Sequence, residues 1–238
     1  MSKAIKKSKL ESVPAFLKES MNDLRGSEQV ENSDITIPRI EIVQSLSKVR
    51  KKNEANYIPG IEEGMLYNNV TREVYGDELE VIPVYFTKEW LLWRDVDAGG
   101  GFGGAYQTRE DAEAAKAAMD NPDEYENVGT SQQFVLIVKP DGLEEAVLSM
   151  AKSKSKVSRD WNALVRMSGG PRFSRSYIVQ GVASQNNMGQ DYFNLRVSSK
   201  GFVNENQFAY AENVYNLITS GSVGVDRGVD ESAAVADM

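Results

Sequence analysis

The chain has 238 residues, of which 41% are hydrophobic and 9% aromatic. This composition is sufficient for a buried core without covalent cross-links. The chain contains neither cysteine nor histidine. Disulfide bonds and thiolate chemistry are therefore excluded, and the side chain that serves most often as a general base and transition-metal ligand is missing.

The charge is unevenly distributed along the chain. The 27 basic and 35 acidic residues give a net charge of −8. Residues 109–126 carry seven acids and two bases, and residues 221–238 carry four acids and one base, so these segments supply −5 and −3. Residues 139–200 instead carry ten bases and five acids. A basic surface of this kind attracts a polyanion, and an acidic appendage can compete for it.

The first 33 residues are polar and rich in lysine, serine and glutamate, with one short possible helix at residues 13–24. We expect a flexible basic arm here. The N-terminus lacks the apolar segment of a secretory signal, and no stretch approaches the roughly 20 apolar residues of a membrane span. We therefore expect a soluble cytoplasmic protein without membrane contact.

Three short extended segments follow the arm. Residues 34–43 alternate apolar and polar side chains, but Pro38 restricts them to an edge strand. Residues 65–70 and 73–75 are typical of short strands around a turn.

Five longer segments are rich in β-branched and aromatic residues, and we expect each to form a strand. They are residues 79–94, 132–139, 143–150, 173–184 and 192–202. A helix is expected at residues 108–119, with Thr108 as its N-cap. Another is expected at residues 155–167, where Trp161 and Leu164 share an apolar face, and Asn204 predicts the start of a last helix.

Five strands with a helix between the third and fourth follow the chain order of an OB-fold. The sequence therefore predicts a mainly β domain at residues 34–220, a five-stranded Greek-key barrel with an N-terminal elaboration and a C-terminal helix. Residues 221–238 are small, polar and acidic, and we expect them to form a disordered tail.

Basic and aromatic residues in this domain indicate a binding site for single-stranded DNA. Cations neutralise phosphates and release counterions, and aromatic rings stack on bases. The candidate cations are Lys139, Lys152, Lys154, Lys156, Arg159, Arg172, Arg175, Arg196 and Lys200. For the basic residues at positions 152–166, the alternative to DNA contact is a solvent-exposed helix face with Trp161 in the core. By alternation, Tyr192, Arg196 and Lys200 share the outer face of the last strand. The same pattern is also typical of a half-exposed strand that does not bind DNA.

The candidate stacking residues are Trp90, Trp93, Phe102, Tyr106 and Tyr192. Trp90 and Trp93 are three positions apart, so on a regular strand they face opposite ways. We expect one of them in the core and the other at the DNA, without deciding which. The glycine-rich residues 99–104 lack the Gly-Lys-Ser/Thr ending of a P-loop, and we expect a mobile flap rather than a phosphate cradle.

Two acidic features complete the candidates. Two carboxylate clusters could in principle hold Mg²⁺: Asp95 with Asp97, and Asp141 with Glu144 and Glu145. Both clusters lie in or beside loops, so we expect them to be ordinary surface charges rather than metal ligands. The tail acids are Asp226, Asp230, Glu231 and Asp237. We expect them to compete with DNA for the basic groove and to contact partner proteins, the alternative being an inert terminus.

The sequence resembles the single-stranded-DNA-binding replication proteins of tailed bacteriophages over most of residues 34–203. The resemblance rests on these segments: Ile37-Pro38-Arg39-Ile40, Ile58-Pro59-Gly60-Ile61, residues 64–68, 79–84, the loop after Trp93, residues 155–161, 170–173 and 187–189. It implies an OB-fold that coats single-stranded DNA, with an acidic C-terminal tail for protein contacts. The chain ends Ala236-Asp237-Met238, whereas some relatives end in phenylalanine, which puts recognition through a terminal aromatic residue in doubt.

We therefore expect a non-enzymatic, sequence-independent single-stranded DNA-binding protein of phage replication or recombination, acting in the host bacterial cytoplasm without cofactor or metal. Its expected partners are single-stranded DNA and, through the tail, phage or host replication and recombination proteins. A strand-annealing or recombination-mediator protein is the first alternative. A carboxylate-metal nuclease and a phage structural protein without nucleic-acid affinity are the others.

Overall fold

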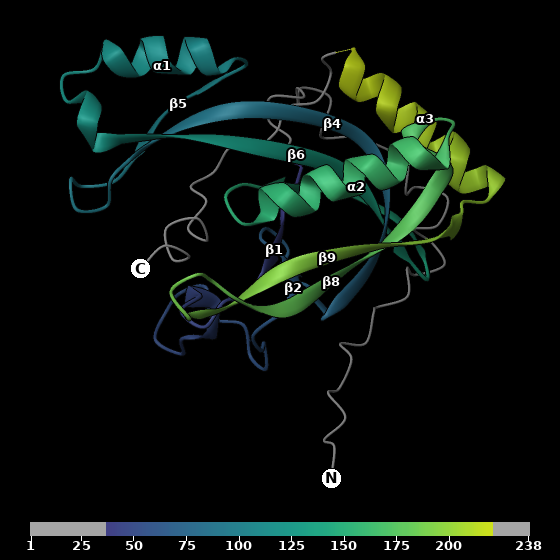
Figure 1. Ribbon diagram of the computed structural model, residues 1–238. Helices are drawn as coiled ribbons and strands as arrows, with labels where there is room; N and C mark the ends of the chain where they lie inside the picture. The colour runs from purple at the N-terminus through teal and green to yellow at the C-terminus, as the bar shows by residue number, and fades with distance from the viewer. Residues whose placement is uncertain (1–36, 221–238) are drawn as a thin grey trace, which may run out of the picture.

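The computed structural model describes residues 37–220, which form two antiparallel sheets and three helices (Figure 1). The small sheet contains β1 (Ile40–Ile42), β2 (Leu66–Asn68) and β3 (Val74–Gly76). The large sheet contains β4 (Glu78–Arg94), β5 (Phe102–Tyr106), β6 (Tyr125–Lys139), β7 (Gly142–Met150), β8 (Arg175–Gln185) and β9 (Asp191–Phe202). The helices are α1 (Arg109–Ala117), α2 (Lys154–Ser168) and α3 (Glu205–Thr219).

The large sheet has the order β7-β6-β4-β8-β9, with β5 added to β4. The expected helix between the third and fourth long strands is α2, and the expected C-terminal helix is α3. The predicted closed five-stranded barrel is not present: the sheet has six strands, and β7 and β9 lie at opposite ends of its order. The chain is therefore mainly β and antiparallel, as the composition and patterning predicted.

The segment around β1 lies between the two strands that a barrel would have to join. Arg39 pairs with Val147 of β7 as an isolated parallel bridge. The Gln44 side chain donates to the carbonyl oxygen of Phe193 in β9 at 2.7 Å and accepts from its N–H at 2.9 Å. These contacts satisfy backbone groups at both edges, which explains why β7 and β9 need not pair with each other.

The core lies on both faces of the large sheet. On one face, Trp161 of α2 is fully buried in a cluster with Val81, Leu148 and Tyr177. On the other face, Ala211 and Val214 of α3 pack over Ile82 and Leu136. The two helices thus cover opposite faces, and Trp161 has the core role that was the alternative to DNA contact.

Local signals explain the helix boundaries. Thr108 accepts a hydrogen bond from the Asp111 N–H as the N-cap of α1. Asn204 and Gln207 form a capping box at the start of α3, which satisfies two otherwise unpaired backbone donors. Among residues 37–220, no helix combines the length and apolar character needed to cross a membrane.

A long extension projects from the core. Beyond the Ser131–Met150 pair, β7 ends while β4 and β6 continue to the Arg94–Tyr125 pair. Together with β5 and α1, these strands form an extension that Figure 1 shows at the upper left, far from α3. We call this region, residues 86–133 with its strands and helix, the wing.

Candidate nucleic-acid interface

The two faces of the wing differ in charge. The β4–β6 register is regular from Tyr85–Phe134 to Arg94–Tyr125, so side chains alternate between the faces and paired residues share one. One face, which we call the cationic face, carries Phe86, Lys88, Trp90, Leu92, Arg94, Tyr125, Asn127, Gly129, Ser131 and Gln133. The opposite one, the carboxylate face, carries Thr87, Glu89, Leu91, Trp93, Glu126, Val128, Thr130 and Gln132.

Trp90 is the centre of the cationic face. The Lys88 ammonium lies 4.5 Å from its ring centroid, and the Arg109 guanidinium of α1 lies 5.6 Å from it. Trp90 pairs with Gly129, where an added Cβ would come within 3.0 Å of the indole ring. The glycine thus makes room for the ring, and the ring attracts both cations through its π-system.

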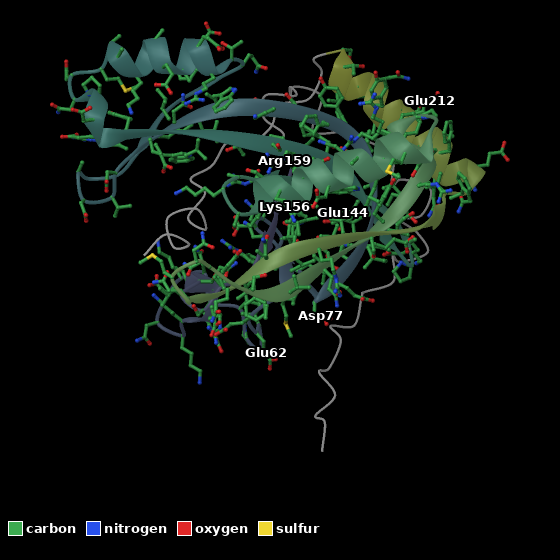
Figure 2. All side chains as sticks on the ribbon, viewed as in Figure 1. Glu62, Asp77, Glu144, Lys156, Arg159 and Glu212 are labelled. Carbon is green, nitrogen blue, oxygen red and sulfur yellow. The ribbon has the colours of Figure 1, made fainter. Side chains whose placement is uncertain are left out.

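The cationic face continues onto α2. Gln133 of this face donates to the Ser158 hydroxyl at 3.0 Å and to the Asn162 side-chain oxygen at 3.2 Å. Arg159 and Arg166 are exposed and stand three and four positions from Asn162, on the same side of the helix. Figure 2 labels Arg159 on the β6 side of α2 and Lys156 on the β9 side. Two further cations therefore border the cationic face.

Arg172 has a structural environment rather than a surface one. Its guanidinium donates to Gln133 Oε1 and, at 2.8 Å, to Asn162 Oδ1, and lies 5.6 Å from the Phe86 ring centroid. Burial lowers the pKa of Arg172 to about 10. The side chain holds α2 against β6, so its first role is to position the helix that carries Arg159 and Arg166.

Trp93 lies on the carboxylate face, opposite to Trp90, as the spacing predicted. Both indoles are half-buried, so neither has the core position that was expected for one of them. It pairs with Phe102 of β5, and the two ring centroids are 5.1 Å apart. Phe102 is 43% exposed. Tyr106 instead pairs with Trp90 and shares the cationic face. The structure therefore separates the four predicted wing aromatics into two pairs on opposite faces.

Several predicted cations already contact carboxylates or other partners. Lys139 pairs with Glu73 at 2.6 Å and with Glu144; burial lowers its pKa, but these hydrogen bonds outweigh burial and raise it. Lys152 lies 3.2 Å from Glu126, Lys200 pairs with Glu80, and Arg196 donates to Gln180 at 2.5 Å. These four cations therefore already have partners in the structure.

The other predicted residues are placed as follows. Arg175 stacks 3.8 Å from the Phe202 ring centroid at the base of β8. Lys154 and Tyr192 are half-buried, and exposed Lys156 lies 3.9 Å from Asp160. Leu195 is buried with Phe193 and Val197 packed on the same core, while Arg196 and Lys200 are exposed, which confirms the predicted alternation of β9 at these positions. Tyr192 and Asn194, expected on the outer face, are half-buried. The tail acids at residues 226–237 lie outside the described residues.

Sequence reasoning missed Lys88 and Arg109 and did not select Arg166. Lys88 stands two positions before Trp90 on the same strand, a spacing that places both side chains on one face and could have been read directly. Arg109 could not have been found in this way, because its approach to Trp90 depends on how α1 folds back over β4.

The wing also holds an open pocket of about 440 Å³. Its lining residues are Arg94, Gly103, Ala118, Met119, Asp120, Asn121, Glu124 and Tyr125. Arg94 is ion-paired with Glu124 at 2.6 Å, so this lining does not favour an anion. Within the described part of the chain, acidic side chains do not gather in a group of three or more that could hold a metal ion.

Comparison with known proteins places the chain in a phage family. The family model described as Pam3 phage gp34-like protein matches residues 5–224. The chain belongs to this family. Neither the curated proteins nor the solved structures contain a match. The phage origin expected from the resemblance is thus supported, whereas the family description says nothing of DNA.

The match includes every described residue of the chain, from Ile37 to Ser220. The wing, α2 and the N-terminal sheet therefore belong to the family domain rather than to an appendage. Any function proposed for the cationic face is consequently a proposal about that domain.

Proposed function

We propose that this protein binds single-stranded DNA without sequence preference, along the cationic face of the wing and the adjoining side of α2. The observation that carries the proposal is the charge difference across the wing sheet. The strand residues of the cationic face include Lys88 and Arg94 and no carboxylate, although Arg94 is paired with Glu124 just before β6. The strand residues of the opposite face include Glu89 and Glu126 and no cation, although Lys152 reaches Glu126 from beyond β7.

The proposed contacts follow from the chemistry of single strands. Lys88, Arg109, Arg159 and Arg166 would contact phosphates, whose neutralisation supplies most of the affinity. Trp90 and Tyr106 offer aromatic surface to bases, at about 1–3 kcal/mol per stacked base. Stacking does not distinguish one base from another, so this arrangement supports binding without a sequence code.

The strand order supports a relation to the OB architecture. With β4 as the first barrel strand, the order β7-β6-β4-β8-β9 is third-second-first-fourth-fifth, and α2 occupies the position between the third and fourth. We propose an OB-type sheet whose closure is replaced by the segment around β1. In this scheme β4 and β6 are the first two barrel strands. They and α2 carry the cationic face, and the strand order brings them together.

Tryptophan emission tests which face DNA contacts. The chain has three tryptophans, and Trp161 is fully buried. Titration with oligo-dT at low salt should quench the wild-type emission. Trp90→Phe should lose most of this quenching while keeping affinity within a few-fold in an anisotropy assay with labelled oligo-dT, because phenylalanine still stacks. Trp93→Phe should keep the quenching.

The cations of α2 are tested with a charge-matched pair. Arg159→Gln/Arg166→Gln should reduce the slope of log K against log salt by about 1.4, since each phosphate contact to a single strand contributes about 0.7. Lys51→Gln/Lys52→Gln removes the same charge from an exposed loop and should change the slope little. Equal effects of the two variants, or no binding by the wild type, would contradict the proposal.

A further inference from the structure

The cationic face of the wing receives a carboxylate from α1. Glu113 Oε1 accepts a hydrogen bond from Nδ2 of Asn127, a residue of this face, at 2.9 Å. The same oxygen lies 3.8 Å from Arg109 Nε, and the Arg109 guanidinium in turn lies 5.6 Å from the Trp90 ring centroid. An anion thus stands among the side chains that the proposed function assigns to a phosphate and a base.

Helix stability does not explain this carboxylate. Arg109 is the first residue of α1 and Glu113 follows four positions later. A base before an acid is the less stabilising order within a helix. Both side chains are exposed, so their attraction in water is weak. Asn127 belongs to β6, and the contact with it is therefore a tertiary one that holds Glu113 at the sheet.

Packing decides which side of α1, the helix along the wing in Figure 1, is turned towards the strands. Ala112 is the one buried residue within α1. At 3.6 residues per turn, Arg109 and Glu113 lie within about 100° of Ala112 around the helix, whereas Glu110 lies about 160° from it. Glu110 is exposed. The helix therefore offers two acids of equal charge, one at the cationic face and one on the solvent side.

We propose that Glu113 is an internal competitor of DNA, whose carboxylate occupies the place on the cationic face where a phosphate binds. A carboxylate and a phosphate are both anionic acceptors for amide and guanidinium donors, so Asn127 and Arg109 serve one at the expense of the other. DNA binding exchanges the two anions, and Glu113 turns into solvent. This inference rests on the proposed function and names a residue that regulates the same site.

A positioning role for Glu113 is the alternative, and it predicts an effect of opposite sign. If Glu113 oriented Arg109 towards a phosphate, removing the carboxylate charge would weaken DNA binding. If Glu113 competes with the phosphate, the same change strengthens binding. The 3.8 Å between Arg109 Nε and Glu113 Oε1 favours competition, because this distance is too long for a hydrogen bond that would fix the guanidinium.

Glu113→Gln tests the proposal in the full-length protein, because glutamine keeps an acceptor for Asn127 and removes the charge. The Kd for labelled oligo-dT at low salt should fall about fourfold, the effect of one unit charge about 5 Å from a phosphate in water. Glu110→Gln is the matched control on the same helix. It should lower the Kd by less than about twofold, since its charge lies a helix diameter farther away.

A double-mutant cycle separates competition from general repulsion. In an Arg109→Gln background, Glu113→Gln should lower the Kd by less than about twofold, because the two anions no longer share that cation. General repulsion between Glu113 and DNA would leave the fourfold gain unchanged in this background. The cycle therefore identifies Arg109 as the group for which the two anions compete.

Three results would overturn the inference while the wild type still binds oligo-dT. They are an unchanged or higher Kd in Glu113→Gln, equal gains in Glu113→Gln and Glu110→Gln, and a gain that does not depend on Arg109. The proposed function survives each of them. A lack of oligo-dT binding by both the wild type and Glu113→Gln would overturn the inference and the proposed function together.

Discussion

At the scale of single residues, Arg172 and Gln133 show how strongly burial changes the role of a polar side chain. Gln133 is 0% exposed and accepts from Arg172 while donating to Ser158 and Asn162. A basic residue after a helix was a reasonable DNA-contact candidate by sequence. Tertiary packing instead encloses its guanidinium between β6, α2 and the Phe86 ring.

We predict that Gln133→Leu lowers the free energy of unfolding by about 2 kcal/mol, because a buried guanidinium loses an acceptor. Urea denaturation measures this change. Adding Arg172→Met should recover part of the loss, since replacing both partners by apolar groups leaves fewer unsatisfied atoms. A double variant as unstable as the sum of the two single variants would show that the pair is not coupled.

At the scale of elements, β8 packs closely against the N-terminal segment at two glycines, Gly181 and Gly64. A Cβ on Gly181 would lie 2.0 Å from the carbonyl oxygen of Gly64, and a Cβ on Gly64 would lie 2.6 Å from the Phe193 ring. Gly64 also has a φ of +81°, which side chains other than glycine rarely adopt. The close approach brings the segment from Gln44 to Gly64 against the β8–β9 hairpin.

We predict that Gly181→Ala destabilises the protein by about 3 kcal/mol, because backbone must move to admit the methyl group. Gly201→Ala is the matched control in the same hairpin, since a Cβ there meets nothing within 4 Å. Its effect should stay within about 0.5 kcal/mol. Thermal unfolding followed by circular dichroism compares the two, and similar melting temperatures would contradict the close packing.

At the scale of the whole molecule, the acidic C-terminal segment should compete with DNA. Deleting residues 221–238 removes a net charge of −3, and we predict tighter binding of labelled oligo-dT at low salt. The gain should shrink as added salt screens the interaction. Replacing Asp226, Asp230, Glu231 and Asp237 by their amides should reproduce it. Equal affinity in the full-length and shortened proteins would remove the competing-tail hypothesis.

Short-range patterns predicted a large part of this protein. The apolar stripe with Trp161, the Asn204 cap, the Thr108 cap and the alternation of β9 depend on residues within one or two turns, or on successive strand positions. Such features are set by local hydrogen bonding and periodicity. The order of strands and helices, and hence the mainly β class, followed from these local elements.

The pairing of distant segments decided the rest. The register of β4 with β6 places Trp90 among cations and Trp93 among carboxylates, and the fold-back of α1 brings Arg109 to Trp90. The bridge from Arg39 to Val147 and the Gln44 contacts replace barrel closure. Contacts between residues tens of positions apart leave no periodic trace in the sequence, because their geometry arises only when the core packs. Tertiary structure therefore decided which charged and aromatic residues share a surface.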